Sequence, residues 1–157
     1  MFGSATLKDG VPLYFSGKEA VSALADLLPS RPGATVLDAG SGVGTVIASL
    51  SVRRPDALVE GVEAALLPWF LSWLRGAANG ASFRASLGDF WDVDFGRFDI
   101  VYAFLSPAPM RRLWDKARHE MRPGSVLVSN SFAVPGVAPA RVLKLERTGR
   151  LLYVWHM

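Results

Sequence analysis

Residues 36–44 read VLDAGSGVG: an apolar run, an aspartate, and three glycines at alternate positions. The apolar run predicts a short buried strand, and Val46, Ile47 and Leu50 predict a helix directly after the glycines. Glycine allows the backbone to turn tightly and to approach a ligand, and the free N–H groups at the start of a helix point toward that ligand. The stretch therefore predicts a loop that binds a nucleoside-containing cofactor at the carboxyl ends of the strands.

The spacing of the glycines narrows the choice of cofactor. A dinucleotide site has the pattern G-x-G-x-x-G, whereas this loop has Thr45 in the place of the third glycine. The loop also lacks the Lys and the Ser or Thr of a P-loop, which disfavours a nucleoside triphosphate. The candidate cofactor-binding residues of the loop are Asp38, Gly40, Ser41, Gly42 and Gly44.

The segments around this loop alternate between predicted helices and strands. Ser16 and Glu19 form a capping-box pattern, which predicts a first helix from Ser16 to about Leu28. Further helices are expected to begin near residues 46, 67 and 110. The expected strands cover residues 35–37, 57–62, 81–85, 98–104, 126–128, 142–145 and 151–155.

This order of elements predicts an α/β fold, because parallel neighbouring strands need a crossover helix between them. The last two strands are joined by a short turn at Thr148 and Gly149, so they are expected to be antiparallel. The predicted architecture is a Rossmann-like three-layer sandwich with a seven-strand, mostly parallel sheet and an antiparallel C-terminal strand pair. We expect a single domain over residues 1–157, with an N-terminal segment and helix in 1–32 and the cofactor-binding sheet in 33–157.

Composition excludes several classes of protein. A chain of 157 residues that is 50% hydrophobic can bury a core, which argues against disorder. The absence of cysteine excludes a disulfide framework, a thiolate metal site and a cysteine nucleophile, and it favours a cytoplasmic location. No stretch has the about 20 apolar residues that span a bilayer. His119 and His156 have no partners at metal-ligand spacing, and the scattered net charge of +3 does not indicate a nucleic-acid partner.

Two further acids follow expected strands and complete the candidate cofactor site. Glu63 ends the second strand, where a carboxylate can accept hydrogen bonds from both hydroxyls of a ribose. Asp89 and Phe90 follow the third strand and offer an adenine an acceptor for its amino group and a flat apolar ring for stacking. The alternatives are structural: Glu63 caps the next helix, and Asp89 is a turn residue beside core aromatics.

Together, the loop and these acids resemble those of the class I, seven-strand S-adenosylmethionine-dependent methyltransferases. Within this class, the chain is most similar to the small single-domain protein-lysine methyltransferases. The stretches that carry the finer resemblance are VPLY at 11–14, GVE at 61–63, PW at 68–69, GDFW at 88–91 and VSNSF at 128–132. In the glycine loop, Val43 and Thr45 stand where the lysine enzymes have Asp and Arg. The resemblance implies S-adenosyl-L-methionine as the cofactor, a lysine side chain of a protein as the acceptor, and Tyr14 as a further cofactor-binding residue.

The resemblance also implies an acceptor channel after the fourth and fifth strands. Methyl transfer to an amine needs an unprotonated nitrogen, and an apolar, aromatic channel favours the neutral amine by desolvating it. Tyr102 and Phe104 are expected as walls of this channel, with core packing as the alternative role for each. Ser106 or Asn130 is expected to orient the amine, with Ser129 facing them from the fifth strand.

Three alternatives remain open. Base-methylating enzymes carry Asp or Asn, two prolines and an aromatic residue after the fourth strand, whereas residues 106–109 read SPAP, so nucleic acid is a secondary option. Small-molecule enzymes usually add lid segments, for which this chain has little room. The third alternative is a non-catalytic module that binds a partner, suggested by Val43, Thr45 and the aromatic helix at 69–73. The sequence sets neither the number of methyl groups added nor the oligomeric state.

Overall fold

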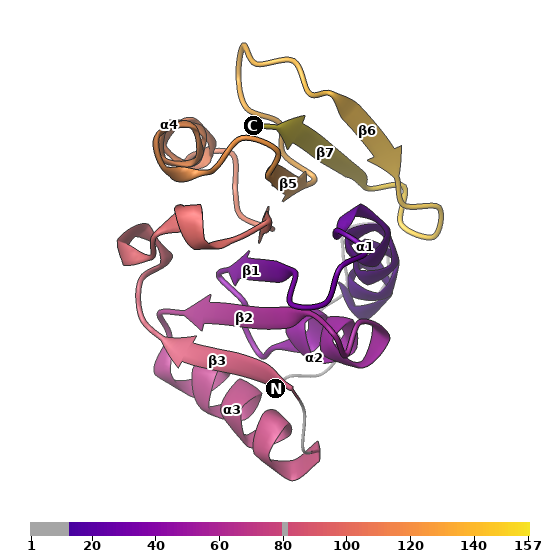
Figure 1. Ribbon diagram of the computed structural model, residues 1–157, viewed down its shortest axis with the longest axis vertical. Helices are drawn as coiled ribbons and strands as arrows, with labels where there is room; N and C mark the ends of the chain where they lie inside the picture. The colour runs from indigo at the N-terminus through magenta and orange to yellow at the C-terminus, as the bar shows by residue number, and fades with distance from the viewer. Residues whose placement is uncertain (1–12, 80–81) are drawn as a thin grey trace.

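The computed structural model describes residues 13–79 and 82–157, which form one seven-stranded sheet flanked by helices (Figure 1). The strands are β1 Thr35–Ala39, β2 Leu58–Glu63, β3 Phe83–Leu87, β4 Ile100–Ala103, β5 Val126–Asn130, β6 Arg141–Lys144 and β7 Leu151–His156. The helices are α1 Leu13–Leu27, α2 Thr45–Arg53, α3 Leu66–Asn79 and α4 Met110–Glu120, with short 3₁₀ turns at Phe90–Asp92 and Phe95–Arg97.

The order of the strands confirms the predicted architecture. The sheet runs β3-β2-β1-β4-β5-β7-β6, with parallel pairing from β3 to β5 and antiparallel pairing of β7 with both β5 and β6. The order reverses between β1 and β4, and such a switch point opens a crevice at the carboxyl ends of the strands. Asp38 of β1 pairs in register with Tyr102 of β4, so these two residues lie side by side below that crevice.

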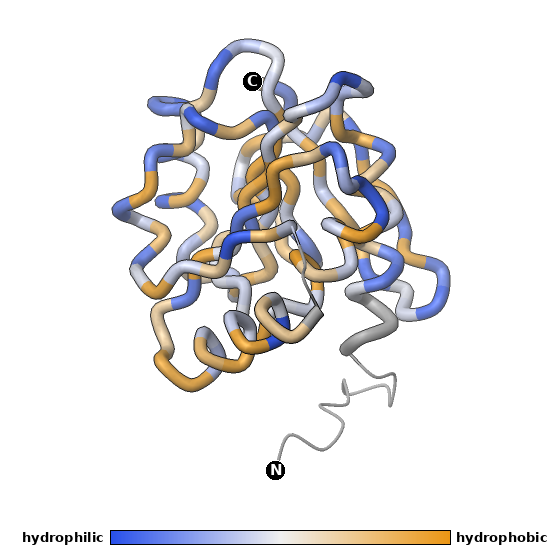
Figure 2. The backbone as a smooth tube through the Cα atoms, turned by 60° about the horizontal axis from the view of Figure 1, so that its bottom comes forward, coloured by the Kyte–Doolittle hydropathy of each residue, from blue (hydrophilic) through white to orange (hydrophobic). Residues whose placement is uncertain are grey.

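The helices cover opposite faces of the sheet, α1 and α2 on one side and α4 on the other (Figure 1). Ile47 of α2 packs in one core cluster with Val36 and Tyr102, and Leu113 of α4 belongs to a second cluster across the sheet. Successive residues of a strand point to opposite faces. Asp38, two positions after Val36, therefore points to the side of α1. Figure 2 shows apolar strands inside the molecule and polar turns around them.

The first helix begins earlier than expected. α1 starts at Leu13, so Ser16 lies inside the helix and not at the predicted N-cap position. The Glu19 carboxylate instead accepts a hydrogen bond from the Arg147 backbone N–H at 2.8 Å, which ties α1 to the turn between β6 and β7. Tyr14, expected before the helix, lies in its first turn, and its side chain is outside the described part of the chain.

The strands differ from their expected bounds by one or two residues, as β3, β4 and β5 illustrate. β3 is shifted toward the C-terminus, to Phe83–Leu87. β4 covers only Ile100–Ala103, because Phe98 closes a 3₁₀ turn through a hydrogen bond from its N–H to the Phe95 carbonyl. β5 continues to Asn130, beyond the expected end at residue 128. In each case a local turn or cross-strand pairing overrides the pattern of apolar residues.

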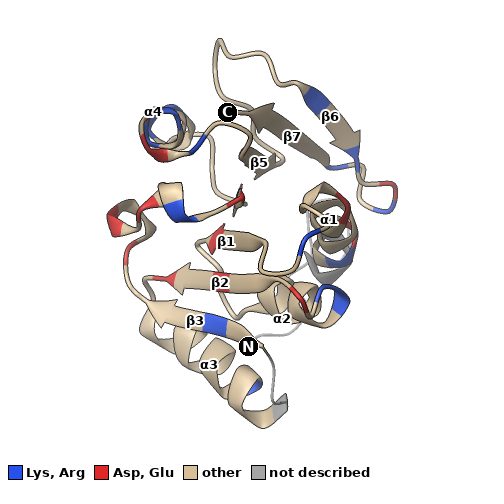
Figure 3. Ribbon diagram, viewed as in Figure 1, with Lys and Arg blue, Asp and Glu red and all other residues tan. Residues whose placement is uncertain are grey.

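The aromatic helix α3 turns one aromatic side chain inward and two outward. The Trp69 indole N–H donates to the Ala85 carbonyl at 3.0 Å, which fixes α3 against β3. Phe70 and Trp73 are 44% and 48% exposed, on a helix that carries almost no charge (Figure 3). In residues 13–79 and 82–157, no helix is both long and apolar enough to cross a membrane.

Candidate active site

The glycine loop adopts the conformation that only glycine takes without strain. Gly40, Gly42 and Gly44 have φ of 79°, 58° and 83°, all in the left-handed region. The N–H groups of Gly40 and Ser41 both donate to the Val62 carbonyl, at 2.9 and 3.0 Å, which anchors the loop on the end of β2. Gly44 is the N-cap of α2, so the loop leads directly into the start of that helix. This is the predicted arrangement of strand, glycine loop and helix N-terminus.

Glu63 lies at the carboxyl end of β2 and contacts the glycine loop directly. One carboxylate oxygen accepts the Gly42 N–H at 2.9 Å, and the other accepts the Ala65 N–H at 2.8 Å, just before α3. Glu63 therefore holds the loop and the approach to the next helix together. Each oxygen keeps a second lone pair, which leaves the carboxylate able to accept from a ribose hydroxyl.

Asp38 is the buried acid of the site, only 6% exposed. Its burial raises the pKa of Asp38 to about 7, and the negative charge of Glu63 acts in the same direction. The carboxyl group thus keeps its proton to a much higher pH than an ordinary aspartate does. A cation bound next to it would favour the ionised form.

Asp89 and Phe90 follow β3, next to the end of β2. The Gly88 N–H donates to the Glu63 carbonyl at 3.0 Å, which holds the two strand ends together. The exposed Asp89 caps a 3₁₀ turn by accepting the Trp91 N–H at 3.0 Å. The Phe90 ring packs against Trp91 with centroids 4.5 Å apart and stays partly accessible. The acceptor and the flat ring are therefore neighbours, and the capping role of Asp89 is also present.

The segment after β4 lies against the glycine loop. A Cβ atom on Gly40 would lie 3.4 Å from the Leu105 side chain, so the start of the loop touches this segment. Phe104 is partly buried and Ser106 is exposed. The segment that carries these two expected acceptor residues therefore lies against the glycine loop at Leu105.

Tyr102, for which core packing is the alternative to a channel wall, and Asn130, expected to orient the amine, lie inside the protein. Both are buried, with Tyr102 2% and Asn130 0% exposed, and Tyr102 packs in the core cluster of α1 and α2. The Asn130 amide donates to the Tyr102 hydroxyl at 3.1 Å and accepts from the Ser131 hydroxyl at 2.7 Å. Burial, with the charge of Asp38, raises the pKa of Tyr102, so its phenol stays protonated. Ser129 points to the opposite face and donates to the Phe132 carbonyl at 2.6 Å.

Arg150 is a charged residue of this region that the sequence did not indicate. It precedes β7, and its guanidinium donates to the Ser131 hydroxyl at 2.6 Å. The Arg150 Cζ atom also lies 5.0 Å from the centre of the Phe104 ring. These contacts join residues far apart in the sequence, so no local pattern around the turn at 148–149 could have signalled them.

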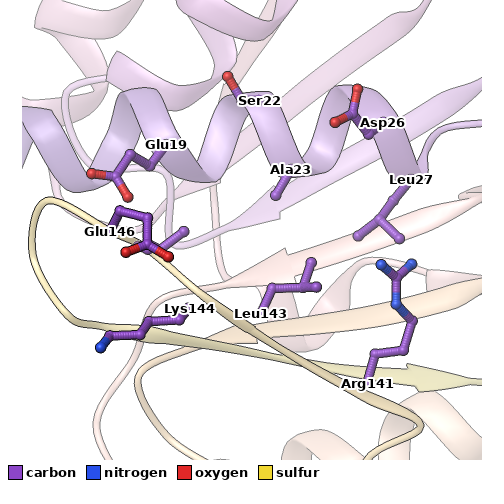
Figure 4. A pocket seen from close by; sticks show the side chains of 10 residues that line it. Glu19, Ser22, Ala23, Asp26, Leu27, Arg141, Leu143, Lys144 and Glu146 are labelled. Carbon is purple, nitrogen blue, oxygen red and sulfur yellow. The ribbon is translucent and has the colours of Figure 1, made fainter.

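A separate hollow of about 390 Å³ lies between α1 and β6 (Figure 4). Its floor is apolar, with Ala23, Leu27 and Leu143, while Glu19 and Glu146 lie close together at one end. None of the predicted site residues lines it.

The basic face of α4 is partly neutralised by its own neighbours. Lys116 pairs with Glu120 at 2.7 Å, and the Arg112 guanidinium lies 4.1 Å from the centre of the Trp91 ring. His119 contacts the Asp115 carbonyl one turn earlier. Over residues 13–79 and 82–157, no group of three potential metal ligands gathers.

The sheet order, the glycine loop at its switch point and the acids among the last residues of β1 and β2, Asp38 and Glu63, define the fold class of the S-adenosylmethionine-dependent, class I methyltransferases. The family model described as the ANTKMT methyltransferase domain matches residues 38–141. The chain belongs to this family of methyltransferase domains.

Individual relatives agree with this family. The chain is 36% identical over 138 residues to a protein-lysine N-methyltransferase of Saccharolobus islandicus, a match that covers 87% of this chain and 86% of that protein. It is 35% identical over 127 residues to trans-aconitate 2-methyltransferase of Deinococcus radiodurans, covering 73% of this chain and 45% of that protein. The chain thus spans less than half the length of the Deinococcus relative.

A solved structure shows the same fold. The RNA methyltransferase of Salinibacter ruber, in complex with S-adenosyl-L-homocysteine, is similar with a TM-score of 0.76 and 24% sequence identity. The similarity covers 88% of each chain. At this level of identity it supports the fold of the chain.

Proposed function

We propose that the chain transfers the methyl group of S-adenosyl-L-methionine to a lysine side chain of a protein substrate. The observation that carries the proposal is the hydrogen bond from the Gly42 N–H to the Glu63 carboxylate. Gly42 belongs to a loop whose three glycines have left-handed backbone conformations, and this loop lies at the switch point of the sheet. The match to the archaeal protein-lysine N-methyltransferase supports the choice of acceptor. The cytoplasmic location expected from the cysteine-free sequence stays part of this proposal.

The residues present fit this cofactor. When bound, S-adenosylmethionine supplies an electrophilic methyl group on a positively charged sulfonium. Glu63 offers lone pairs to the ribose, and Asp89 with Phe90 offers an acceptor and a ring face to the adenine. The buried Asp38 lies below the crevice, and its ionised form would stabilise a cationic ligand bound there.

The acceptor end has to receive an amine without its proton. A lysine amine has an ordinary pKa of about 10.4, and an apolar environment lowers it by disfavouring the ammonium. Phe104 and Leu105 give this end of the sheet its apolar character, and Leu105 touches the loop at Gly40. The exposed Ser106 is the proposed hydrogen-bond partner that orients the amine.

Labelled methyl transfer to lysate proteins tests the proposal. The donor is S-adenosylmethionine with a labelled methyl group, and the matched control is the same lysate after its lysines have been acetylated, because an amide nitrogen accepts no methyl group. We expect incorporation into the first lysate and at least a tenfold loss in the second. Equal incorporation into both would exclude lysine as the acceptor.

A carboxylate is the second candidate acceptor, and Arg150 is the observation that favours it. A guanidinium beside Phe104 is suited to a carboxylate, and the Deinococcus relative is named for trans-aconitate, a carboxylate substrate. Alkali distinguishes the two products, because it releases methanol from a methyl ester and leaves a methylated amine intact. Transfer to trans-aconitate with alkali-labile product would favour this candidate.

A further inference from the structure

One chain of hydrogen bonds crosses the acceptor end of the sheet, from the start of β7 to β4. Arginine has only donors, so the Ser131 hydroxyl must accept from Arg150 and directs its own proton elsewhere. That proton is donated to the side-chain oxygen Oδ1 of Asn130, which turns the side-chain nitrogen Nδ2 of Asn130 toward the Tyr102 hydroxyl. The direction of each bond in the chain thus follows from Arg150.

Two features of this chain of hydrogen bonds reduce the stability of the fold. Among the described residues, Ser131 is the one non-glycine residue in the left-handed region, with φ of 74°. The Arg150 Nε atom is buried and has no hydrogen-bond partner within the described residues. Strained backbone and unpartnered polar atoms are concentrated at functional sites, since the rest of a protein has no reason to retain them.

The same arginine reaches the second acceptor aromatic directly. Its Cζ atom lies 5.0 Å from the centre of the Phe104 ring, and its positive charge acts on the Tyr102 phenol. Arg150 therefore touches one expected wall residue and determines the hydrogen bonding of the other. The turn that carries it is fixed at its other end by the bond from Arg147 N–H to Glu19, beside the hollow of Figure 4.

We propose that Arg150 is the positioning residue of the acceptor end, holding Phe104 by contact and Tyr102 through Ser131 and Asn130. The inference rests on the proposed methyl transfer and applies to an amine or a carboxylate acceptor. It predicts that the turn between β6 and β7 belongs to the acceptor site, whereas the glycine loop binds the cofactor without it.

The variant Ser131→Gly separates positioning from stability. Glycine removes the hydroxyl that links Arg150 to Asn130, and it also adopts φ of 74° without strain. We expect a melting temperature equal to or above that of the wild type, with kcat for methyl transfer reduced at least tenfold. A purely structural role for Ser131 predicts instead that kcat follows the melting temperature, and unchanged kcat would overturn the proposal.

The variant Arg150→Met tests the other end of the chain. Methionine keeps an apolar stem over Phe104 and removes both the charge and the donors. We expect kcat to fall at least tenfold while the Kd of S-adenosylmethionine, measured by calorimetry, changes less than twofold. Arg141→Met, on the same hairpin and exposed, is the matched control and should retain kcat. A loss of cofactor affinity as large as the loss of kcat would contradict the proposal.

Two measurements complete the test. The double variant Ser131→Gly with Arg150→Met should lose no more kcat than the worse single variant, because both substitutions break the same chain of hydrogen bonds. A loss of kcat equal to the product of the two single losses would overturn the proposal. Nuclear magnetic resonance of the Asn130 side-chain amide needs no acceptor: its protons should exchange slowly in the wild type and at least tenfold faster in Arg150→Met. Unchanged exchange overturns the positioning role, and absent methyl transfer by the wild type counts against the proposed function alone.

Discussion

The two halves of the carboxyl edge of the sheet are built in different ways. At the ends of β1 and β2, the chain offers backbone N–H groups and carboxylates, with Glu63 bonded to the Gly42 N–H at 2.9 Å. At the ends of β4, β5 and β7, it offers a relay of side chains from Arg150 to Tyr102. The first half depends on backbone conformation and the second on side-chain orientation. Substitutions in the first half should therefore reduce stability and cofactor affinity, whereas substitutions in the second half should reduce kcat.

The largest expected effect is on the glycine loop. A Cβ atom on Gly44 would clash with the Ser72 side chain, and alanine is strained at φ of 83°. We expect Gly44→Ala to reduce the free energy of unfolding by about 3 kcal/mol, since overpacking and left-handed strain both contribute. Denaturant unfolding and calorimetry should show lower stability and no measurable cofactor binding.

Gly42→Ala is the matched control for this effect. The position also has positive φ, 58°, but a Cβ atom there has no neighbour within 4 Å. The strain alone should cost about 1 kcal/mol. Equal destabilisation by the two variants would show that the contact with Ser72 contributes nothing.

The next effect concerns the buried acid of the cofactor half. The folded-state pKa of Asp38, about 7, lies above the ordinary value of 3.8, so the folded protein binds this proton more tightly than the unfolded chain. The stabilisation that this proton gives to the folded state is complete at pH below 3.8 and is lost as the pH rises toward 7. Asp38→Asn should therefore be about 2–4 kcal/mol more stable than the wild type at pH 8 and similar at pH 4, by thermal or denaturant unfolding.

The same variant should lose cofactor affinity. Asparagine cannot supply the negative charge that a sulfonium favours, so we expect the Kd of S-adenosylmethionine to rise at least tenfold at pH 8. In the wild type, binding near pH 6.5 should release a proton, detected as a buffer-dependent heat in calorimetry. Binding without proton release would place the cation away from Asp38.

A smaller effect is expected at the end of β3. Asp89 caps its 3₁₀ turn through the Trp91 N–H, and loss of such a cap costs about 1 kcal/mol. If Asp89 also accepts a hydrogen bond from the adenine amino group, Asp89→Ala should raise the Kd of S-adenosylmethionine by about tenfold, because one charge-assisted hydrogen bond is lost. A variant with lower stability and unchanged Kd would leave Asp89 with the capping role alone.

The same contrast explains how far the sequence could be interpreted. The seven-strand, mostly parallel sheet, the antiparallel C-terminal pair and the glycine loop at 40–44 were predictable, because glycine spacing and apolar periodicity are local signals. The start of α1 was not, since Glu19 is used in a contact with Arg147 rather than in a cap. The relay from Arg150 to Tyr102 was not predictable either, because Arg150 meets Ser131 and Phe104 only after the sheet has formed. The sequence also does not indicate that the buried Tyr102 and Asn130 are hydrogen-bonded to each other.

The most direct test of this contrast is calorimetric titration of S-adenosylmethionine into three proteins. The wild type should bind, Glu63→Ala should lose at least tenfold in affinity, and Arg150→Met should bind within twofold of the wild type. Binding that is absent from the wild type, or lost equally in both variants, would contradict the assignment of the cofactor to the β1 and β2 half of the edge.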